Sequence, residues 1–260
     1  MNQVPVEYEL RLAVCEKDKI AAQRLRYIVF VEELGGDGPL VDHDARLEKD
    51  EFDDFAAHLV LIDKSNGDPH NVVGVYRLMD SDMAQRAGQF YSAGEYDLAP
   101  LLANNRPALE LGRSCLHPDH RGGAAMYHLW HGLSEYVAKH GIEILFGTAS
   151  FHGTDISSLA QPLSLLHHRH LAPESLRVTV LPEHGVQMDV LPDDQISRKE
   201  AMLQIPALIK AYLRIGGYVG QGAFVDHAFN TTDVMLILDT AQMNDKQHAL
   251  YTGRRKGQKT

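Results

Sequence analysis

A short turn that is rich in histidine and glycine separates two apolar stretches near the middle of the sequence. It reads His-Pro-Asp-His-Arg-Gly-Gly over residues 117–123, and Met126, Leu129 and Leu133 follow it at helical spacing. The first N–H groups of a helix have no partner within the helix, and the helix dipole makes that end attractive to an anion. The turn is therefore typical of a phosphate-binding site, in which Arg121 can add a charge-assisted contact. It is also typical of an ordinary helix start, where glycine only lets the chain turn.

The segments on either side of this turn predict the elements that hold it in place. Residues 109–116 alternate between apolar and polar side chains, as a half-buried strand does. The apolar stripe after the turn predicts a helix, and Lys139, His140 and Gly141 predict its end. Residues 142–150 are apolar and few, so we predict a buried strand there. The stretch 109–155 is thus predicted to be a strand, a glycine-containing loop, a helix and a second strand.

The composition limits the class of protein. A chain of 260 residues with 44% hydrophobic residues suits one large globular domain with a real core. Its formal net charge of -10 argues against general nucleic-acid binding, which needs a basic surface. Cys15 and Cys115 are too few for a disulfide framework and fit the reducing cytoplasm. We predict no signal peptide at residues 1–10, and no apolar run reaches the roughly 18 residues that a membrane span needs.

The same patterns predict the rest of the fold. Strands are expected at residues 8–14, 57–62, 71–79 and 233–238, and helices at 18–34, 81–87, 159–170 and 205–215. This order predicts a mixed α/β (α+β) sheet with helices on both faces, and in one such architecture two central strands part so that a ligand enters between them. We predict one domain over residues 1–240 with an elaboration at about 156–232, followed by a polar, basic tail at 241–260 that frays.

An acidic run occupies residues 42–54. It contains seven carboxylates (Asp42, Asp44, Glu48, Asp50, Glu51, Asp53 and Asp54) against two basic residues. Such a run usually forms a solvated loop, and this is the default prediction. The alternative is a patch that attracts a cationic substrate.

Several runs of residues resemble known families of acyl-transferring enzymes. The order of elements, with the turn at 117–123 entering a helix, resembles the acyl-CoA-binding core of the GNAT superfamily. That family has Arg-x-x-Gly-x-Gly/Ala in this loop, and here Ala124 and Met126 occupy the last two small positions. The single phosphodiester of a carrier protein's phosphopantetheine arm needs fewer glycines than the two linked phosphates of coenzyme A. This departure from the family pattern argues against coenzyme A as the donor and favours acyl carrier protein.

A closer resemblance comes from runs spread along the chain. Residues 26–30, 50–53, 74–78 and 110–113 (Arg-Tyr-Ile-Val-Phe, Asp-Glu-Phe-Asp, Gly-Val-Tyr-Arg-Leu and Glu-Leu-Gly-Arg) follow the order seen in acyl-homoserine-lactone synthases. Residues 109–115, 150–155, 166–173 and 229–233 are most similar to the L-ornithine N-alpha-acyltransferases that begin ornithine-lipid synthesis. This resemblance implies a GNAT-like fold with splayed central strands. It also implies transfer of a 3-hydroxy fatty acyl group from acyl carrier protein to the α-amine of L-ornithine by direct attack of the amine on the thioester.

The implied reaction assigns catalytic roles to residues of the first central strand. The amine must lose a proton before it attacks, and Glu110 is the first candidate base, with Asp50 and Asp53 next. The alternative for Glu110 is a structural ion pair with Arg113 or Arg77. Strict alternation would place Glu110 and Arg113 on opposite faces, so we predict a β-bulge near Gly112 that turns both into one cleft.

The implied substrates assign the binding residues. The side-chain ammonium of ornithine is expected to bind Asp50 or Asp53, or else Asp226 and Asp233. The alternative for Asp226 and Asp233 is a structural role, in which they accept backbone hydrogen bonds in turns and caps. The carboxylate of ornithine asks for Arg26, Arg77 or Arg113, and Phe30 belongs to the same substrate-binding set. Backbone N–H groups at Cys115, Leu116 and His117 are candidates for the oxyanion site. The donor's phosphopantetheine arm is expected to bind these three residues and Arg121, Gly122, Gly123 and Ala124.

A cysteine, three histidines and a basic tail could also carry chemistry, but we interpret the cysteine and the histidines as structural. Nothing local activates Cys115, so we reject a thioester relay through it. His167, His168 and His170 lack an accompanying ligand set at metal spacing, so we predict no metal site. Arg254, Arg255, Lys256 and Lys259 are a solubilising end or a contact with anionic lipid or carrier protein.

The sequence thus predicts a cytoplasmic enzyme with acyl carrier protein and L-ornithine as partners, no nucleic acid and no cofactor beyond the donor's phosphopantetheine. A peripheral contact with the inner face of the membrane is part of this prediction. The first alternative is an acyl-homoserine-lactone synthase-like enzyme that uses S-adenosylmethionine. The second alternative is a non-catalytic acyl-carrier or lipid-binding protein of the same fold.

Overall fold

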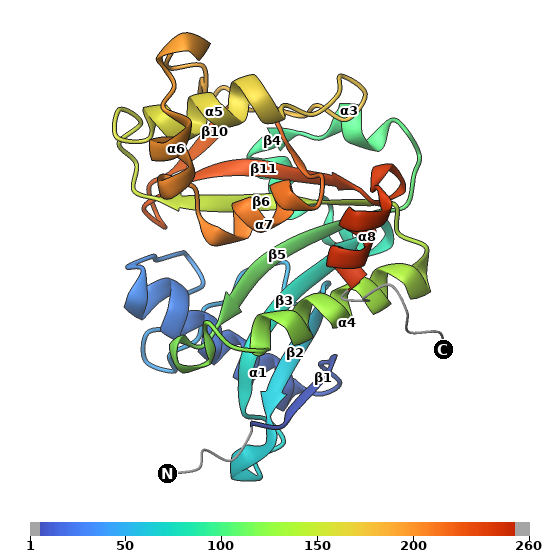
Figure 1. Ribbon diagram of the computed structural model, residues 1–260. Helices are drawn as coiled ribbons and strands as arrows, with labels where there is room; N and C mark the ends of the chain where they lie inside the picture. The colour runs from blue at the N-terminus through green and yellow to red at the C-terminus, as the bar shows by residue number, and fades with distance from the viewer. Residues whose placement is uncertain (1–5, 253–260) are drawn as a thin grey trace.

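The computed structural model describes residues 6–252, which form a mixed sheet between layers of helices (Figure 1). The strand order is β1-β2-β3-β5-β6-β11-β10-β8, with β9 paired to β11, and only the β5–β6 pair in this sheet is parallel. The strands are β1 (Tyr8–Leu12), β2 (Ala57–Asp63), β3 (Val72–Asp80), β5 (Ala108–Leu116), β6 (Ile144–His152), β8 (Gly185–Val186), β9 (Tyr218–Val219), β10 (Ala223–Asp226) and β11 (Thr231–Asp239). Strands β4 (Tyr96–Asp97) and β7 (Thr179–Val180) pair separately. The predicted mixed sheet is confirmed.

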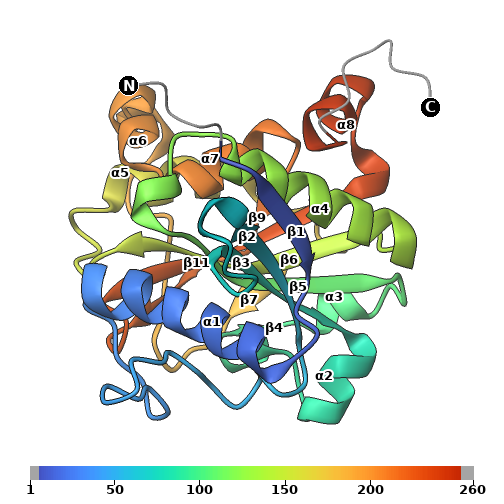
Figure 2. The ribbon, with the colours of Figure 1, turned by 90° about the horizontal axis from the view of Figure 1, so that it is seen from below.

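Helices cover both faces of this sheet, because successive side chains of its strands point to opposite faces and both faces carry apolar side chains. The helices are α1 (Glu16–Arg26), α2 (Ser81–Ala87), α3 (Ala99–Leu102), α4 (Ala125–His140), α5 (Ala160–His170), α6 (Arg198–Gln204), α7 (Ala207–Arg214) and α8 (Asp245–Thr252). In β2, Leu59 and Leu61 pack in the core cluster of α4, whereas Val60 and Ile62 pack in that of α1. The view from below shows α1 and α4 on opposite sides of these strands (Figure 2).

The predicted unit at residues 109–155 is confirmed as β5, a turn, α4 and β6. Leu129, Leu133 and Val137 form the buried stripe of α4. Gly141 ends the helix in the left-handed conformation with φ +64°, which glycine adopts without steric cost.

Some elements differ from the sequence expectation. The α-helix predicted at 18–34 ends at Arg26 and continues as a π-helix, η1 (Tyr27–Glu33). The short strands β9 and β10 and the helix α6 were not predicted. The expected fraying after residue 241 is wrong for 245–252, because α8 packs on α4 and buries Tyr251. The four basic tail residues lie outside the described residues.

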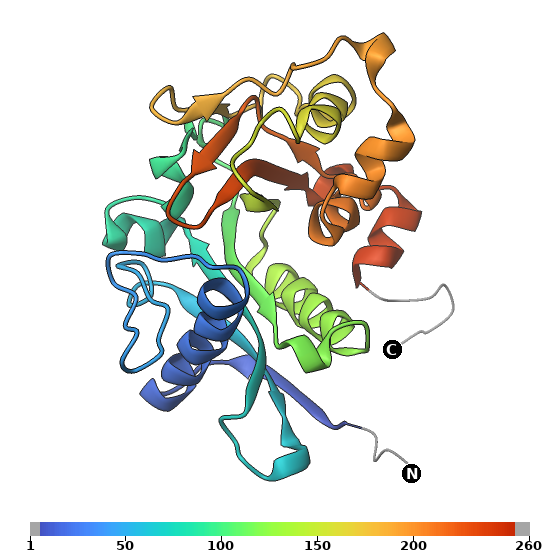
Figure 3. The ribbon, with the colours of Figure 1, turned by 90° about the vertical axis from the view of Figure 1, so that its left-hand side faces the viewer.

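The two central strands part after three residue pairs. Strands β5 and β6 are nine residues long, yet they pair only from Ala108–Ile144 to Glu110–Phe146. At the point of divergence, a Cβ on Gly147 would lie 2.1 Å from the carbonyl oxygen of Leu111, so only glycine fits there. Figure 1 and the side view in Figure 3 show the two halves of the sheet diverging from this point. The predicted splay is confirmed.

The predicted bulge in β5 is confirmed as well. Gly112 pairs with Arg77 and Cys115 pairs with Val75, so two residues of β5 lie opposite the single residue Tyr76. Arg113, the first of the two, has φ +51°. The bulge reverses the alternation after Gly112, and Glu110 and Arg113 consequently line one cavity.

No helix within residues 6–252 is long and apolar enough to cross a bilayer. Within the predicted elaboration, helices α5 to α7 pack on the β6–β11 half of the sheet (Figure 1), whereas β8, β9 and β10 extend the sheet itself and β7 pairs with β4. The division of the chain into a domain at 1–240 and a tail stays a prediction.

Candidate active site

A cavity of about 250 Å³ lies where β5 and β6 part. Its walls come from residues 110–114 of β5 and 146–150 of β6, and α7 and β11 complete it. Six of the predicted site residues line it: Phe30, Arg77, Glu110, Arg113, Asp226 and Asp233. The predicted residues Arg26, Asp50 and Asp53 lie behind it, and the predicted donor-binding residues 115–117 and 121–124 lie outside this lining.

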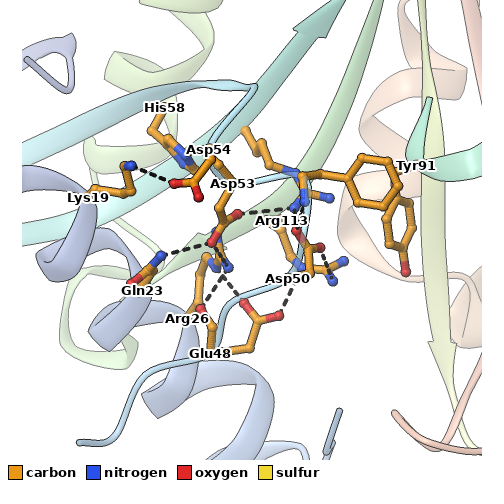
Figure 4. A network of polar contacts seen from close by, with 12 residues as sticks. Lys19, Gln23, Arg26, Glu48, Asp50, Asp53, Asp54, His58, Tyr91 and Arg113 are labelled. Carbon is orange, nitrogen blue, oxygen red and sulfur yellow. Dashed lines mark hydrogen bonds and ion pairs between the residues drawn. The ribbon is translucent and has the colours of Figure 1, made fainter. Parts of the chain in front are cut away.

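Three arginines and three carboxylates form a network behind one wall of the cavity (Figure 4). Arg26 of α1 binds Glu48 and donates to both oxygens of Asp53 at 2.8 Å. Arg113 donates to Glu48 at 3.1 Å and to Asp50 at 2.8 Å. The hydrogen bonds of the network hold the wall in place. The wall has no net charge from these residues, because the three positive and three negative charges cancel.

The default prediction of a solvated loop is wrong for this part of the acidic run. Glu48 is 1% exposed and Asp53 is 3% exposed. The reason is that their partners Arg26 and Arg113 come from distant parts of the chain, and buried charges are tolerated when they are paired and hydrogen-bonded. Arg26 is wholly buried in these contacts, so it holds the network and does not face a substrate.

Arg77 has spare hydrogen-bonding capacity. Its Nη1 binds Asp50 and Asp53, but its buried Nη2 has no partner among the described residues. Arg77 lines the cavity, so Nη2 can bind the carboxylate of a ligand. Tyr91 of the short helix η3 (Tyr91–Gly94) stacks on Arg113, with 4.8 Å between the guanidinium carbon and the ring centre.

Glu110 is buried and accepts three hydrogen bonds from η3. The N–H of Tyr91 donates to Oε2 at 2.9 Å, and the N–H of Ser92 donates to Oε1 at 2.7 Å. The Ser92 hydroxyl also donates to Oε1. The ion pair with Arg113 or Arg77, which was the structural alternative, is not among the ion pairs of the described residues. Burial raises the pKa of Glu110, and the hydrogen bonds from Ser92 oppose part of that rise.

The pKa values of the other two candidate bases, Asp50 and Asp53, are lowered instead. Burial alone would raise the pKa of Asp53, but the adjoining Arg26 guanidinium outweighs it and holds that pKa well below the ordinary value. Arg77 and Arg113 likewise lower the pKa of Asp50 against the effect of burial. Both carboxylates therefore stay ionised and are weak proton acceptors.

Asp226 and Asp233 line the side of the cavity formed by β10 and β11. Asp226 also has the structural role that was the alternative prediction for it. It stabilises a turn, because its Oδ1 accepts the N–H groups of Ala228 and Phe229 at 2.8 and 3.0 Å. Asp233 is 5% exposed and its Oδ1 has no hydrogen-bond partner among the described residues. Glu95, which the sequence reasoning missed, is buried next to them.

The predicted donor-binding turn stands at the start of α4. Gly122 has φ +74°, and a Cβ on Gly122 or Gly123 would meet no atom within 4 Å, so the turn is open to a ligand. Ala124 precedes α4 and its first turn has no side-chain cap. Arg121 is already paired with Glu33 at 2.6 Å, and its Nε donates to the carbonyl of Leu116 at 3.2 Å.

The strand before this turn offers one backbone donor of the three predicted. Cys115 pairs with Val75 and the His117 N–H donates to Val73 at 2.8 Å, so the N–H groups of both are directed to β3. The Leu116 carbonyl is turned the other way, to Arg121, and the Leu116 N–H lies on that same side of the strand. Burial raises the pKa of Cys115 to about 12, which agrees with the rejection of a cysteine relay.

Two of the three histidines near the end of α5, His167 and His168, have a carboxylate neighbour that the spacing did not reveal. Asp189 lies 2.9 Å from Nε2 of His168, and ligand atoms of these two residues and His167 lie within 4.8 Å of one another. His168 also contacts the carbonyl of Leu191. These partly exposed contacts fasten the end of α5 to the segment before α6.

Comparison with known proteins places the fold in a class. The model of the Acetyltransferase (GNAT) domain family matches residues 25–131. The acyl-homoserine-lactone synthase LasI has a TM-score of 0.51 at 13% identity, covering 98% of this chain and 100% of its own. The synthase BjaI has a TM-score of 0.53 at 14% identity, covering 95% and 89%. The fold is that of a GNAT-type acyltransferase, as the resemblance implied.

Relatives in sequence narrow this class to one family. The L-ornithine N(alpha)-acyltransferase of Rhodobacter capsulatus is 57% identical over 259 residues, which are 99% of each chain. That of Brucella abortus is 39% identical over 247 residues, 94% of this chain and 88% of its own. The chain belongs to the L-ornithine N(alpha)-acyltransferase family and is an acyltransferase, which confirms the family indicated by the sequence motifs.

Proposed function

We propose that this enzyme transfers a 3-hydroxy fatty acyl group from acyl carrier protein to the α-amine of L-ornithine. The products are an amide, lyso-ornithine lipid, and the free thiol of the carrier protein's phosphopantetheine arm. The observation that carries the proposal is the cavity between the parted strands, in which basic and acidic side chains face one space. The names of the two relatives support ornithine as the acceptor.

Glu110 is the base in this proposal. The attacking amine must be neutral, whereas an ammonium dominates near neutral pH. Glu110 lines the cavity and its raised pKa favours proton uptake, while Asp50 and Asp53 are held ionised by arginines. Glu110 takes the proton directly or through one water, and the amine nitrogen attacks the thioester carbon. The C–S bond then breaks, and the departing thiolate takes up the further proton that the nitrogen loses as it becomes an amide.

The negative oxygen that develops on the carbonyl needs a hydrogen-bond donor. Within the predicted region 115–117, the Leu116 N–H is the group directed away from β3. It is the donor we propose, because a fixed backbone N–H stabilises charge without reorganising during the reaction.

The charges in the cavity give ornithine one orientation. The unpartnered Nη2 of Arg77 binds the amino acid carboxylate, and Asp226 and Asp233 bind the side-chain ammonium. Phe30 contributes apolar wall. The α-amine then lies between these ends, near Glu110.

The donor arrives from the side of the α4 turn. The open backbone at Gly122 and Gly123, together with the uncapped helix start, binds the phosphodiester of the phosphopantetheine arm. Arg121 joins this contact by exchanging its partner Glu33. The arm belongs to the donor, so the proposal includes no separate cofactor and no metal. We place the enzyme in the cytoplasm, with a peripheral contact to the membrane where the lipid product leaves.

The test is to incubate the enzyme with 3-hydroxyacyl carrier protein and a panel of amine substrates while thiol release is followed. Turnover with ornithine and not with S-adenosylmethionine supports the proposal. Turnover with S-adenosylmethionine would indicate the lactone-synthase alternative. Binding of the acylated carrier protein without any turnover would indicate the non-catalytic alternative. Replacing the carrier protein by the matching acyl-CoA tests the donor.

A further inference from the structure

Three carboxylates form an acidic recess beside the cavity: Glu95, Asp226 and Asp233. Glu95 follows η3, Asp226 ends β10 and Asp233 lies in β11, so three separate elements bring them together. Glu95 and Asp233 are each 5% exposed. Asp226 and Asp233 line the cavity, and Glu95 lies behind them.

Among the residues that the structure describes, this recess has no cation paired with it. None of its three carboxylates has a Lys or Arg ion pair within residues 6–252, and the nearby Arg113 already binds Glu48 and Asp50. Oε2 of Glu95 and Oδ1 of Asp233 are buried and lack a hydrogen-bond partner in the same part of the chain. A buried carboxylate without a partner is costly, so it either takes up a proton or binds a cation from outside.

The backbone fixes the recess in position. The Tyr96 hydroxyl donates to the carbonyl of Asp233 at 2.9 Å and to that of Gly222 at 3.1 Å. The carbonyl of Glu95 accepts the Leu181 N–H at 2.8 Å. The segment that carries Glu95 is therefore tied to β11 and to the start of β10, and the three carboxylates cannot move apart to relieve their repulsion.

We propose that Glu95 is a specificity-determining residue that acts through Asp233, so that the acidic recess binds a cationic group at the end of the acceptor's side chain and rejects a neutral side chain of the same length. This inference rests on the proposed function and deepens it. The acceptor's second ammonium supplies the positive charge that the recess lacks. A neutral methyl group at that point would leave buried carboxylate oxygens unpaired, which is how polar sites reject analogues that lack the matching group.

Burial and mutual repulsion favour proton uptake by the recess when no cation is bound. Burial and the charges of Asp233 and Asp226 raise the pKa of Glu95 well above its ordinary value, with Arg113 and a Tyr91 hydrogen bond opposing them. Burial also raises the pKa of Asp233, and the nearby Ser150 and Thr231 side chains oppose part of that rise. A bound ammonium favours the ionised forms and expels this proton. Binding of a cationic side chain therefore strengthens as the pH rises.

The experiment compares L-ornithine with L-norleucine, which carries a methyl group in place of the side-chain ammonium. We would measure kcat/KM for both in the wild type, in Glu95→Gln and in Glu183→Gln, an exposed control of the same chemical change, between about pH 6 and pH 8. Norleucine is also tested as a competitive inhibitor of ornithine. The α-amine titrates similarly in both compounds, so the ratio of the two constants isolates the side chain.

In Glu95→Gln we expect kcat/KM for ornithine to fall at least about tenfold, mainly through KM, as removal of one member of a buried charge cluster does. The constants for norleucine and the KM for the acyl donor stay near their wild-type values, and Glu183→Gln matches the wild type. In the wild type the ratio rises with pH. An unchanged ratio in a folded Glu95→Gln variant overturns the inference, and a pH-independent ratio in the wild type does so without any variant. If the wild type does not acylate ornithine, the proposed function itself fails.

Discussion

Replacing Arg26 by methionine removes the cation that two buried carboxylates share. Glu48 and Asp53 are 1% and 3% exposed, and Arg26 contacts both of them. Breaking a buried ion pair from one side costs about 3–5 kcal/mol, because the remaining charge is left uncompensated. Total stabilities are about 5–15 kcal/mol, so we expect Arg26→Met to lose a large part of the free energy of unfolding.

The loss depends on pH in a direction that follows from the charges. In the wild type, burial raises the pKa of Asp53 but Arg26 overcomes this and depresses it, so Asp53 stabilises the fold above its unfolded pKa and ceases to do so as the pH falls. In Arg26→Met, burial acts without Arg26, and the pKa of Asp53 moves upward. The variant is then penalised at neutral pH and relieved by protonation, so its deficit narrows between about pH 7 and pH 4.

Urea unfolding followed by circular dichroism at several pH values measures this effect. Arg24→Met is the matched control, since Arg24 is an exposed residue of the same helix, and we expect it to stay within about 0.5 kcal/mol of the wild type. The double variant Arg26→Met/Asp53→Asn should recover part of the loss, because it removes a stranded charge. A deficit below about 1 kcal/mol for Arg26→Met, or one that does not change with pH, would refute the reasoning.

Two further changes test the catalytic strand and its neighbour. Glu110→Gln should lower kcat by about 100-fold or more near neutral pH, with a smaller effect at higher pH where more of the amine is already neutral. A rate profile identical to that of the wild type would exclude Glu110 as the base. Gly147→Ala should destabilise the fold by about 1–3 kcal/mol or more, because the new Cβ would meet the Leu111 carbonyl at 2.1 Å. Gly94→Ala has open space around its Cβ and is the control, and equal melting temperatures for the two variants would contradict this account of the splay.

Much of the fold could be predicted because its signals are local. The apolar stripe of α4 and the glycine at its end predict that helix from adjacent residues alone. The bulge could be predicted because the implied reaction places Glu110 and Arg113 in one cleft. Side chains three residues apart point to opposite faces of a regular strand, and one extra residue in the strand brings them to the same face. Two-residue strands have no period to detect, and each depends on a neighbouring strand, as β9 does on β11.

The polar network could not be predicted because its pairs are remote in sequence. Arg113 follows Glu48 by 65 residues, and the acidic run alone looks like any solvated loop. Glu95 was missed for a related reason. It lies in a polar, irregular stretch, and its burial depends on Tyr96 reaching β11 across a separation of 137 residues.

The divergence of β5 and β6 creates two sheet edges inside the molecule. Within residues 6–252, β5 pairs with β3 alone beyond Glu110, and β6 pairs with β11 alone beyond Phe146. Amides on such an edge exchange with water unless an extended, amide-bearing ligand covers them. Deuterium uptake by the amides of residues 112–116 that are directed away from β3, such as that of Leu116, therefore reports on whether the gap is filled. This readout of occupancy requires neither turnover nor a label on the ligand.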